Sequence, residues 1–317
     1  MSQKILISIP AKNEEAMLGS VIDSSKEALI QLTGEIPDIL VVSDGSTDGT
    51  EKVALSHGAK LIPYKVSQGL GYVFQDAVEY AISHNYDILL TIDGDGQFDT
   101  KDIPALLAPI LEKRADFVTG SRFLGGSKVE GIPYAKKIGN TMMSSIISSI
   151  VGKKFMDVSC GFRAYSREAL LSLNVFGKFT YTQEVFINLG VKRISIEEVP
   201  INVQYFKERK SRIAANLFRY AIQTSKIILK SVIHYQPMRI FGRLSFVTAL
   251  IGLPLITAIS IRYAMTDLIT PFKGIAITSI ILLVVSFGSL VAGITLEVLS
   301  RIQLSTEKTI YYARKKS

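Results

Sequence analysis

Residues 87–97 read DILLTIDGDGQ, and in this stretch a short apolar run leads directly into Asp93, Gly94 and Asp95. The run predicts a buried strand, and similar runs occur at residues 5–9, 38–42, 60–63 and 116–119. Helix-like stretches separate these runs, at residues 14–32, 50–56, 71–85 and 101–112. Apolar strands that alternate with helices predict an α/β domain, with a mostly parallel sheet covered on both sides.

Polar side chains follow several of these runs directly. Asn13 and Glu14 come after the first run, Asp44 after the second, and Asp93 and Asp95 after the fourth. Ligands of parallel sheets bind beyond the carboxyl ends of the strands. The sequence therefore predicts a binding site at this edge of the sheet.

Asp93 and Asp95 bring two negative charges into one short loop, and Gly94 relaxes the backbone between them. Two anions close together are costly unless a cation lies between them. Mg²⁺ or Mn²⁺ bound together with a nucleotide diphosphate would supply that positive charge. The alternative is a plain turn, because Asp and Gly are common turn residues.

The composition excludes several classes of protein. The chain has 317 residues, of which 48% are hydrophobic and 20% charged, so it is not a disordered tail. Its mean hydropathy of +0.29 argues against an ordinary cytosolic monomer. The single cysteine, Cys160, excludes an intrachain disulfide and zinc sites built from several cysteines. The net charge of +8 suits phosphate-bearing ligands or an anionic membrane surface, or reflects solubility alone; no nucleic-acid partner is expected.

Two long apolar runs lie near the C-terminus, at residues 244–261 and 274–296. A helix needs roughly 20 apolar residues to cross a bilayer, and the first run reaches that length if it extends over Phe241 and Tyr263. The linker from Arg262 to Lys273 is short, so the two runs predict a transmembrane hairpin. The alternative is a pair of core helices in a soluble domain.

The distribution of lysine and arginine predicts the orientation of this hairpin. Basic residues are frequent in residues 209–243 and in the tail, but they occur only at the edges of the linker. Such segments stay in the cytoplasm, so both termini and the large N-terminal part are expected there. The N-terminus has no long apolar region and does not predict a signal peptide. We therefore expect a multi-pass protein with two spans of the lipid bilayer.

The segment before the hairpin has a pattern of its own. Between residues 213 and 233, apolar residues recur at spacings of three, four and seven with basic residues between them. This pattern predicts an amphipathic helix that lies on the membrane or packs on the domain. The expected domains are 1–206, the α/β domain; 207–240, the juxtamembrane segment; 241–300, the two spans; and 301–317, a basic tail. Small residues in the second span also suit packing into a homo-oligomer, namely Gly288, Ser289 and Gly293.

A set of short motifs occurs along the chain in a particular order. The first three are IPAKNEE at residues 9–15, DGSTDGT at 44–50 and DGDGQ at 93–97. The next are GSRF at 120–123, DVSCGFR at 157–163, QE at 183–184 and EVP at 198–200. In this order and spacing, roughly residues 4–240 resemble the family 2 glycosyltransferases of GT-A fold. Within that family they resemble most the polyprenyl-phosphate glycosyltransferases, the dolichyl-phosphate mannose synthase group, and the hairpin resembles the anchor of many of its members.

The resemblance implies a role for each matching residue. The nucleotide-sugar pocket would be lined by Pro10, Ala11, Asn13, Glu14, Asp44, Asp93, Gly94 and Gln97. Asp93 and Asp95 would hold Mg²⁺ or Mn²⁺. The catalytic residues would be Asp95; Arg122, on phosphate; Glu184, facing the sugar; and Asp157, orienting the acceptor or acting as a base. The acceptor phosphate would be contacted by Lys136, Asn140, Arg163, Arg209, Ser211 and Arg212.

The sequence also departs from the pattern of that group. Lys12 replaces a usual aromatic residue, and Ser43 replaces a common aspartate. Lys136 and Asn140 stand where relatives often have Arg and Ser, so Lys136 would bind phosphate as a point charge rather than as a bidentate fork. Cys160 replaces a usual serine and is interpreted as a small, inert, packed residue.

The implied activity is transfer of a hexose or N-acetylhexosamine, with inversion, from a UDP- or GDP-linked sugar to a polyprenyl phosphate. Two alternatives stay open: an inactive membrane-anchored scaffold on the same fold, and a polysaccharide synthase of the same superfamily. The absence of tryptophan argues against the synthase, since those enzymes usually carry Gln-x-x-Arg-Trp. Retention of the acidic pair with Arg122 and Glu184 argues against the scaffold.

Overall fold

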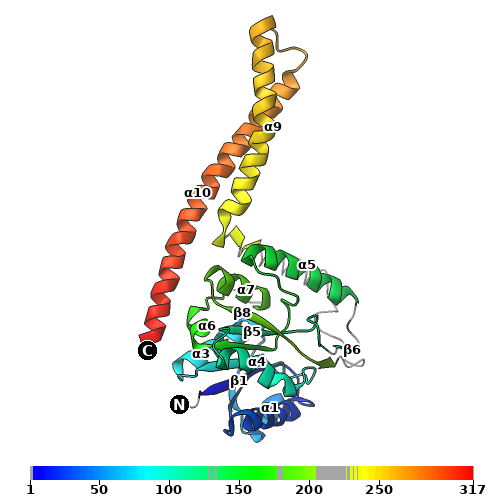
Figure 1. Cartoon of the computed structure of the whole chain (residues 1–317), viewed down its shortest axis with the longest axis vertical. Helices are drawn as coiled ribbons and strands as arrows, with labels where there is room; N and C mark the ends of the chain where they lie inside the picture. Colours follow the sequence, from blue (N-terminus) through cyan, green and yellow to red (C-terminus); the bar gives the residue numbers. More distant parts are fainter. Residues whose placement is uncertain are drawn as a thin grey trace. The chain divides into compact units, whose positions relative to one another are not determined.

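A computed structural model of the chain describes residues 3–127, 129–130, 132, 134–175, 177, 181–204, 226, 229–230, 232–233 and 235–316. The chain forms two compact units (Figure 1). The first contains Met1–Ile228 with Ile310–Ser317, and the second contains Leu229–Thr309.

A seven-stranded sheet forms the centre of the first unit, in the order β3-β2-β1-β4-β7-β5-β8. Its strands are β1 Ile5–Ala11, β2 Asp38–Ser43, β3 Lys60–Pro63, β4 Ile88–Thr91, β5 Phe117–Ser121, β7 Arg163–Ser166 and β8 Ile196–Pro200. Every neighbouring pair is parallel except the pairs of β7, which runs antiparallel to both β4 and β5. A separate parallel pair consists of β6 Val129–Glu130 and β9 Val203–Gln204. The predicted mostly parallel sheet is confirmed.

Helices connect the strands and cover the sheet. They are α1 Leu18–Thr33, α2 Thr50–Ser56, α3 Leu70–Ser83, the 3-10 turn η1 Thr100–Asp102, α4 Ile103–Leu111, α5 Tyr134–Val151, α6 Arg167–Ser172 and α7 Thr182–Val191. The first helix begins four residues later than the sequence pattern predicts. The reason is a turn, in which the Glu14 carbonyl accepts the amides of Met17 and Leu18 while the Glu14 amide donates to Thr50.

The apolar runs predicted as strands are the core of this unit. Ile7, Val41 and Leu90 are fully buried and lie on the adjacent strands β1, β2 and β4. Gly120 lies in β5, where a Cβ atom would come within 2.8 Å of Ile201 Cδ1. Because β1, β2 and β4 are parallel neighbours, their carboxyl ends, and the polar loops that follow them, share one edge of the sheet.

The second unit contains the long helix α9 Pro237–Thr266 and most of the long helix α10 Lys273–Lys316, whose residues from Ile310 onward are counted with the first unit (Figure 1, yellow to red). Both are long and apolar enough to cross a membrane, and 11% of the apolar window of each is buried. The core helix of a soluble protein would be mostly buried, so the two helices are candidate membrane spans. The residues predicted as a basic tail continue α10 as a helix to Lys316.

Small residues let the two helices approach each other closely. A Cβ on Gly293 would come within 2.9 Å of Met238 Sδ, and the Ser245 and Ser286 hydroxyl oxygens lie 3.1 Å apart. Gly293, considered above for contacts between copies, therefore faces α9 of its own chain. Gly288 has open space around it. The amphipathic segment expected at residues 213–233 lies almost entirely outside the described residues.

Candidate functional site

The loops after β1 and β2 are fastened to each other at the carboxyl edge of the sheet. The Asn13 side-chain oxygen accepts the Thr47 amide at 2.8 Å, and the Asn13 amide donates to the Ser46 hydroxyl at 3.2 Å. Asn13 itself has a positive φ of 55°. These contacts of the Asn13 backbone and side chain hold the loop that follows Pro10 and Ala11 at the end of β1 and that also contains Glu14.

Asp44 joins the loop after β2 to the loop that leads into α3. Its carboxylate accepts the Ser67 hydroxyl at 2.6 Å and the amides of Gln68 and Gly69 at 2.6 and 3.2 Å. Gly45 follows with a φ of 69°, and a Cβ there would lie 2.6 Å from the Ser67 amide nitrogen. This close approach of two backbones explains why glycine occupies position 45.

Asp93 and Asp95 follow β4, between the loops after β1 and those around β7. The Gln97 amide donates to Asp95 Oδ1 at 3.0 Å. A Cβ on Gly161 would lie 2.9 Å from Asp93 Oδ1, so the glycine of the Cys-Gly-Phe motif leaves room for this carboxylate. Burial, and then the charge of Asp95, raise the pKa of Asp93 to about 7, while Arg122 acts in the opposite direction. Asp93 is therefore costly to ionise at this position unless a further positive charge is bound nearby.

A divalent cation fits this pair if a bound ligand supplies the rest of its coordination shell. Among the residues that the structure describes, no group of three or more His, Cys, Asp or Glu side chains is arranged to hold a metal. Mg²⁺-type ions are commonly bound by one or two carboxylates, with substrate phosphates completing the shell. Burial and the charge of Asp95 make the ionised form of Asp93 costly, and a bound cation would offset that cost. The two aspartates would thus hold a cation whose remaining ligands come from a bound diphosphate.

A buried ion pair between Arg122 and Asp157 lies near enough to the acidic pair for the charge of Arg122 to act on Asp93. Arg122 Nε and Nη2 lie 2.6 and 2.9 Å from the two carboxylate oxygens of Asp157, whose side chain is 0% exposed. Burial alone would raise the pKa of Asp157, but the Arg122 guanidinium and hydrogen bonds from Arg122 and Ser159 lower it overall. Asp157 is therefore a fixed anion that holds Arg122 in place.

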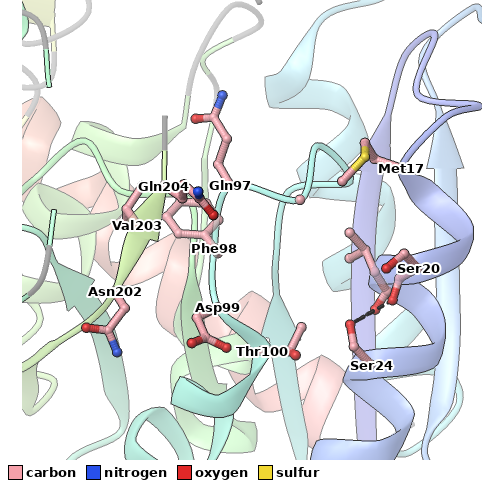
Figure 2. A pocket seen from close by; sticks show the side chains of 12 residues that line it. Met17, Ser20, Ser24, Gln97, Phe98, Asp99, Thr100, Asn202, Val203 and Gln204 are labelled. Atoms are coloured by element: carbon pink, nitrogen blue, oxygen red, sulfur yellow. Dashed lines mark hydrogen bonds between the residues drawn. The ribbon is translucent and has the colours of Figure 1, made fainter. Parts of the chain in front are cut away.

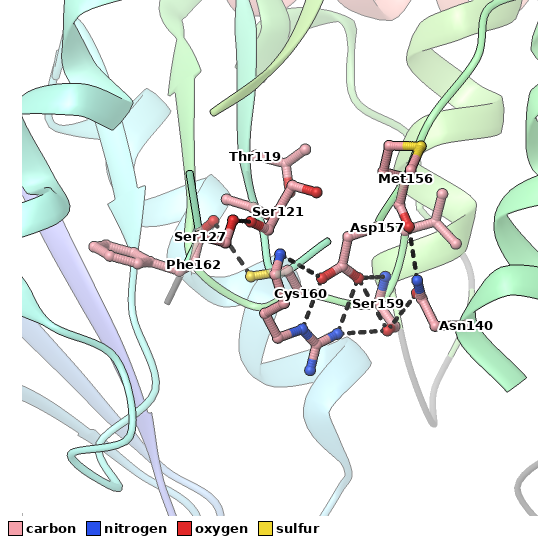
Figure 3. Close-up of polar contacts among 12 residues, drawn as sticks. Thr119, Ser121, Ser127, Asn140, Met156, Asp157, Ser159, Cys160 and Phe162 are labelled. Carbon is pink, nitrogen blue, oxygen red and sulfur yellow. Dashed lines mark hydrogen bonds and ion pairs between the residues drawn. The ribbon is translucent and has the colours of Figure 1, made fainter. Parts of the chain in front are cut away.

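Neighbouring residues position this ion pair from two sides. Ser159 accepts a hydrogen bond from Arg122 Nη2 at 2.7 Å and donates to the Asn140 side-chain oxygen at 3.0 Å, which links the pair to α5 (Figure 3). Glu198, on β8, accepts the amides of Met156 and Asp157 at 2.9 and 2.8 Å. The sequence analysis assigned no role to Ser159 or Glu198, and the signal available for Glu198 was its place in the Glu-Val-Pro motif.

Three further residues singled out from the sequence, Arg163, Glu184 and Cys160, make contacts outside the network around Arg122 and Asp157. Arg163 is fully buried in β7, with its guanidinium over the rings of Phe117, Tyr181 and Phe186. Glu184 lies in the first turn of α7, where its carboxylate accepts the Gly177 amide at 2.8 Å. Cys160 is 1% exposed, and burial raises the pKa of its thiol to about 12, as expected of an inert packed cysteine.

Some predictions fall outside the described part of the chain. Arg209, Ser211 and Arg212, predicted to contact the acceptor phosphate, are not among the residues that the structure describes. Lys136 belongs to α5, but its side chain is not among those described.

Two cavities adjoin these residues. One, of about 430 Å³, lies beside the Asp95 loop between α1 and residues 202–204, and Figure 2 shows Met17, Ser20 and Gln97 around it. The other, of about 700 Å³, borders Arg122. Its polar lining comes from Arg122, Lys137, Thr141, Ser144, Ser145, Ser148 and Lys154, and its apolar lining includes Phe123, Leu124, Phe155 and Met156.

A strand-edge aspartate pair on a mostly parallel sheet is the arrangement expected of a nucleotide-sugar transferase of GT-A fold, and comparison with known proteins agrees. A model of glycosyl transferase family 2 matches residues 6–173, more than half of the chain. The chain therefore belongs to glycosyl transferase family 2, and it is a glycosyltransferase by family.

Relatives of known activity are similar over most of their length. The chain is 28% identical, over 73% of its length and 98% of the relative's, to the UDP-N-acetylglucosamine–dolichyl-phosphate N-acetylglucosaminyltransferase of Methanococcus voltae. It is 29% identical to the undecaprenyl-phosphate mannosyltransferase of Micrococcus luteus, over 65% of this chain and 85% of that one.

Solved structures show the same fold. Glucosyl-3-phosphoglycerate synthase from Mycobacterium tuberculosis matches with a TM-score of 0.58 and 22% identity, over 73% of this chain and 80% of that chain. Another crystal structure of that synthase, with a TM-score of 0.55 and 23% identity, contains Mn²⁺ and UDP; it covers the same shares.

The buried ion pair predicts a specific loss of stability. Asp157→Asn leaves the Arg122 guanidinium buried without its counter-charge, which costs about 3–5 kcal/mol of unfolding free energy. Urea unfolding of the detergent-purified chain measures this change. Since the pKa of Asp157 is lowered in the folded state, the advantage of the wild type should shrink as the pH falls below about 4.

The matched control is Glu197→Gln, which removes the partner of Arg114 in an ion pair where both side chains are partly exposed. It should cost less than about 1 kcal/mol. Equal losses in the two variants would contradict a stabilising role for the Arg122–Asp157 pair.

Proposed function

We propose that the chain transfers a hexose or N-acetylhexosamine from a UDP- or GDP-linked donor to a polyprenyl phosphate, with inversion at the anomeric carbon. The observation that carries the proposal is the juxtaposition of the Asp93–Asp95 pair with the Arg122 cavity, in one domain of a chain with two candidate spans. Relatives named for transfer to dolichyl and undecaprenyl phosphate support it.

The donor would bind at the carboxyl edge of β1, β2 and β4. Its diphosphate would share a divalent cation, Mg²⁺ or Mn²⁺, with Asp93 and Asp95, and the Mn²⁺ and UDP in a structural neighbour support this arrangement. When bound, the cation neutralises the charge that develops on the departing diphosphate. The loops shaped by Asn13 and Asp44 would surround the nucleotide, since both lie at the same edge.

The acceptor phosphate would bind in the cavity beside Arg122. Lys137 and Lys154 contribute positive charge there, and four residues of α5 contribute hydroxyl groups. Phe123, Leu124 and Phe155 supply an apolar wall suited to the first isoprene units. A cavity that is basic and partly apolar suits a lipid monophosphate better than a free sugar.

The transfer reaction depends more on the positioning of the acceptor phosphate against the anomeric carbon than on a strong general base. An acceptor phosphate oxygen attacks the anomeric carbon, and the bond from that carbon to the donor β-phosphate oxygen breaks, with the electron pair leaving on the nucleoside diphosphate. A phosphomonoester has a second pKa near 6, so this oxygen is already largely ionised at pH 7. Asp157, with its lowered pKa and its contacts to Arg122, would position the guanidinium rather than take a proton. Arg163, which is fully buried, would support the site through its positive charge, which acts on Asp93.

The metal role predicts the effect of one conservative change. Asp95→Asn keeps the size of the side chain but removes its charge, so transfer from a radiolabelled donor to undecaprenyl phosphate should fall by about a thousandfold or more. Asp99→Asn is the control, because Asp99 caps the 3-10 turn a few residues later through the Lys101 amide. Its transfer rate should stay close to that of the wild type.

A panel of UDP- and GDP-linked sugars, with and without EDTA, completes this test. Product from at least one donor that disappears with EDTA agrees with the proposal. Nucleotide binding without transfer from any donor would instead favour the inactive scaffold. Full activity of Asp95→Asn would refute the metal role of this residue.

The basic residues on both sides of the hairpin support a cytoplasmic catalytic domain and cytoplasmic termini. The linker after α9 would then face outward. Because Cys160 is buried, a Thr266→Cys variant can be labelled selectively. A membrane-impermeant thiol reagent should reach position 266 in intact cells; reaction only after the cells are opened would reverse the orientation.

A further inference from the structure

The peptide group between Met156 and Asp157 is held by side chains from two elements. Its carbonyl oxygen accepts Asn140 Nδ2 at 2.7 Å (Figure 3) and the Ser144 hydroxyl at 3.2 Å, both from α5. Its N–H donates to Glu198 Oε1 at 2.8 Å, and the amide of Met156 donates to Glu198 Oε2 at 2.9 Å. This segment belongs to neither a helix nor a strand. The side chains that pair with its backbone therefore determine its conformation.

The position of this peptide determines the direction of Arg122. The Asp157 carboxylate accepts Nε and Nη2 of Arg122 and also its backbone amide, the last at 3.1 Å. A guanidinium bound through two nitrogens to one carboxylate has a fixed plane. Met156, on the other side of the peptide, lines the cavity that Arg122 borders. A shift of the peptide would therefore move the guanidinium and part of the cavity wall together.

A carboxylate suits position 198 because two consecutive amides converge on it. Its two oxygens accept both amides, whereas a glutamine offers one oxygen and would turn an NH2 group toward an N–H. Glu197 precedes it on β8, where successive side chains point to opposite faces, and pairs with the partly exposed Arg114. The strand thus offers a matched control for Glu198.

Asn140 holds the same peptide from the opposite side. It is 6% exposed, and both ends of its amide are engaged, the nitrogen by the Met156 carbonyl and the oxygen by the Ser159 hydroxyl. Asn140 is not among the described residues that line the cavity beside Arg122, although the next residue, Thr141, is. The contacts of Asn140 are therefore made with the peptide rather than with the cavity.

We propose that Glu198 and Asn140 are positioning residues for Arg122, which hold the Met156–Asp157 peptide from two sides and thereby set the affinity of the cavity for a phosphate monoester. In this role neither residue touches the substrate. The proposal deepens the proposed function and rests on it in one respect, namely that the acceptor phosphate binds beside Arg122. It gives Asn140 a different role from the phosphate contact that the sequence resemblance implied.

Calorimetric titration of the detergent-purified full chain with geranyl phosphate, a short isoprenyl monophosphate, tests this role. Glu198→Gln should weaken the binding of geranyl phosphate by about tenfold, because Arg122 loses its fixed direction. The affinity for UDP or GDP with Mn²⁺ should not change. Glu197→Gln is the control, and both of its affinities should equal those of the wild type. An unchanged affinity for geranyl phosphate in Glu198→Gln would overturn the proposal, and so would equal weakening of both ligands, which indicates a general structural role.

Asn140→Ala keeps the test decisive if Glu198→Gln folds poorly. It removes the support from α5 and should weaken geranyl phosphate severalfold, again with the nucleotide affinity unchanged. Unchanged binding of geranyl phosphate in Asn140→Ala would contradict the proposal.

A double variant tests whether the two residues act through one peptide. Glu198→Gln combined with Asn140→Ala should lose less affinity than the product of the two single losses, since the second change acts on a peptide already released. Multiplied losses would mean that the residues act independently, and would overturn the proposal. If the wild type binds no geranyl phosphate, the proposed acceptor site fails. The same comparison, made on urea unfolding, then decides the shared role, which additive losses would refute.

Discussion

Repulsion between two carboxylates is the constraint around which this catalytic domain is arranged. Asp93 and Asp95 follow β4 at the edge where β1 and β2 also end, and burial together with their mutual charge raises the pKa of Asp93. An apolar sheet offers no counter-charge of its own, so a cation bound together with a diphosphate would relieve the cost of ionising both aspartates. The three parallel strands thus place the site before any ligand arrives.

The counterpart of this acidic pair is a positive charge held rigidly beside it. Arg122 is fixed by Asp157 and Ser159, and the loop that carries Asp157 is fixed in turn by Glu198. Ser159 and Asn140 continue the network into α5, which lines the cavity beside Arg122. The elements that would receive donor and acceptor are therefore connected through partly buried hydrogen bonds rather than through surface charges alone.

Much of this arrangement follows from patterns that act locally. Strands such as the one at residues 38–42 can be predicted from the local sequence, because a strand that is buried on both faces requires a continuous run of apolar residues. β7 escaped prediction because its residues Arg163–Ser166 include Arg and Ser and are stabilised by antiparallel pairing with strands distant in sequence. The roles of Ser159 and Glu198 likewise depend on partners about 20 to 40 residues away, which no local spacing reveals.

The account stands on a cation shared between the β4 aspartates and a bound diphosphate. Anomalous diffraction at the manganese edge, from crystals of the chain grown with Mn²⁺ and UDP or GDP, tests this directly. The expected result is a peak about 2 Å from a carboxylate oxygen of Asp95 and from the diphosphate oxygens. A nucleotide bound with its diphosphate turned away from both aspartates, and no manganese between them, would contradict the account.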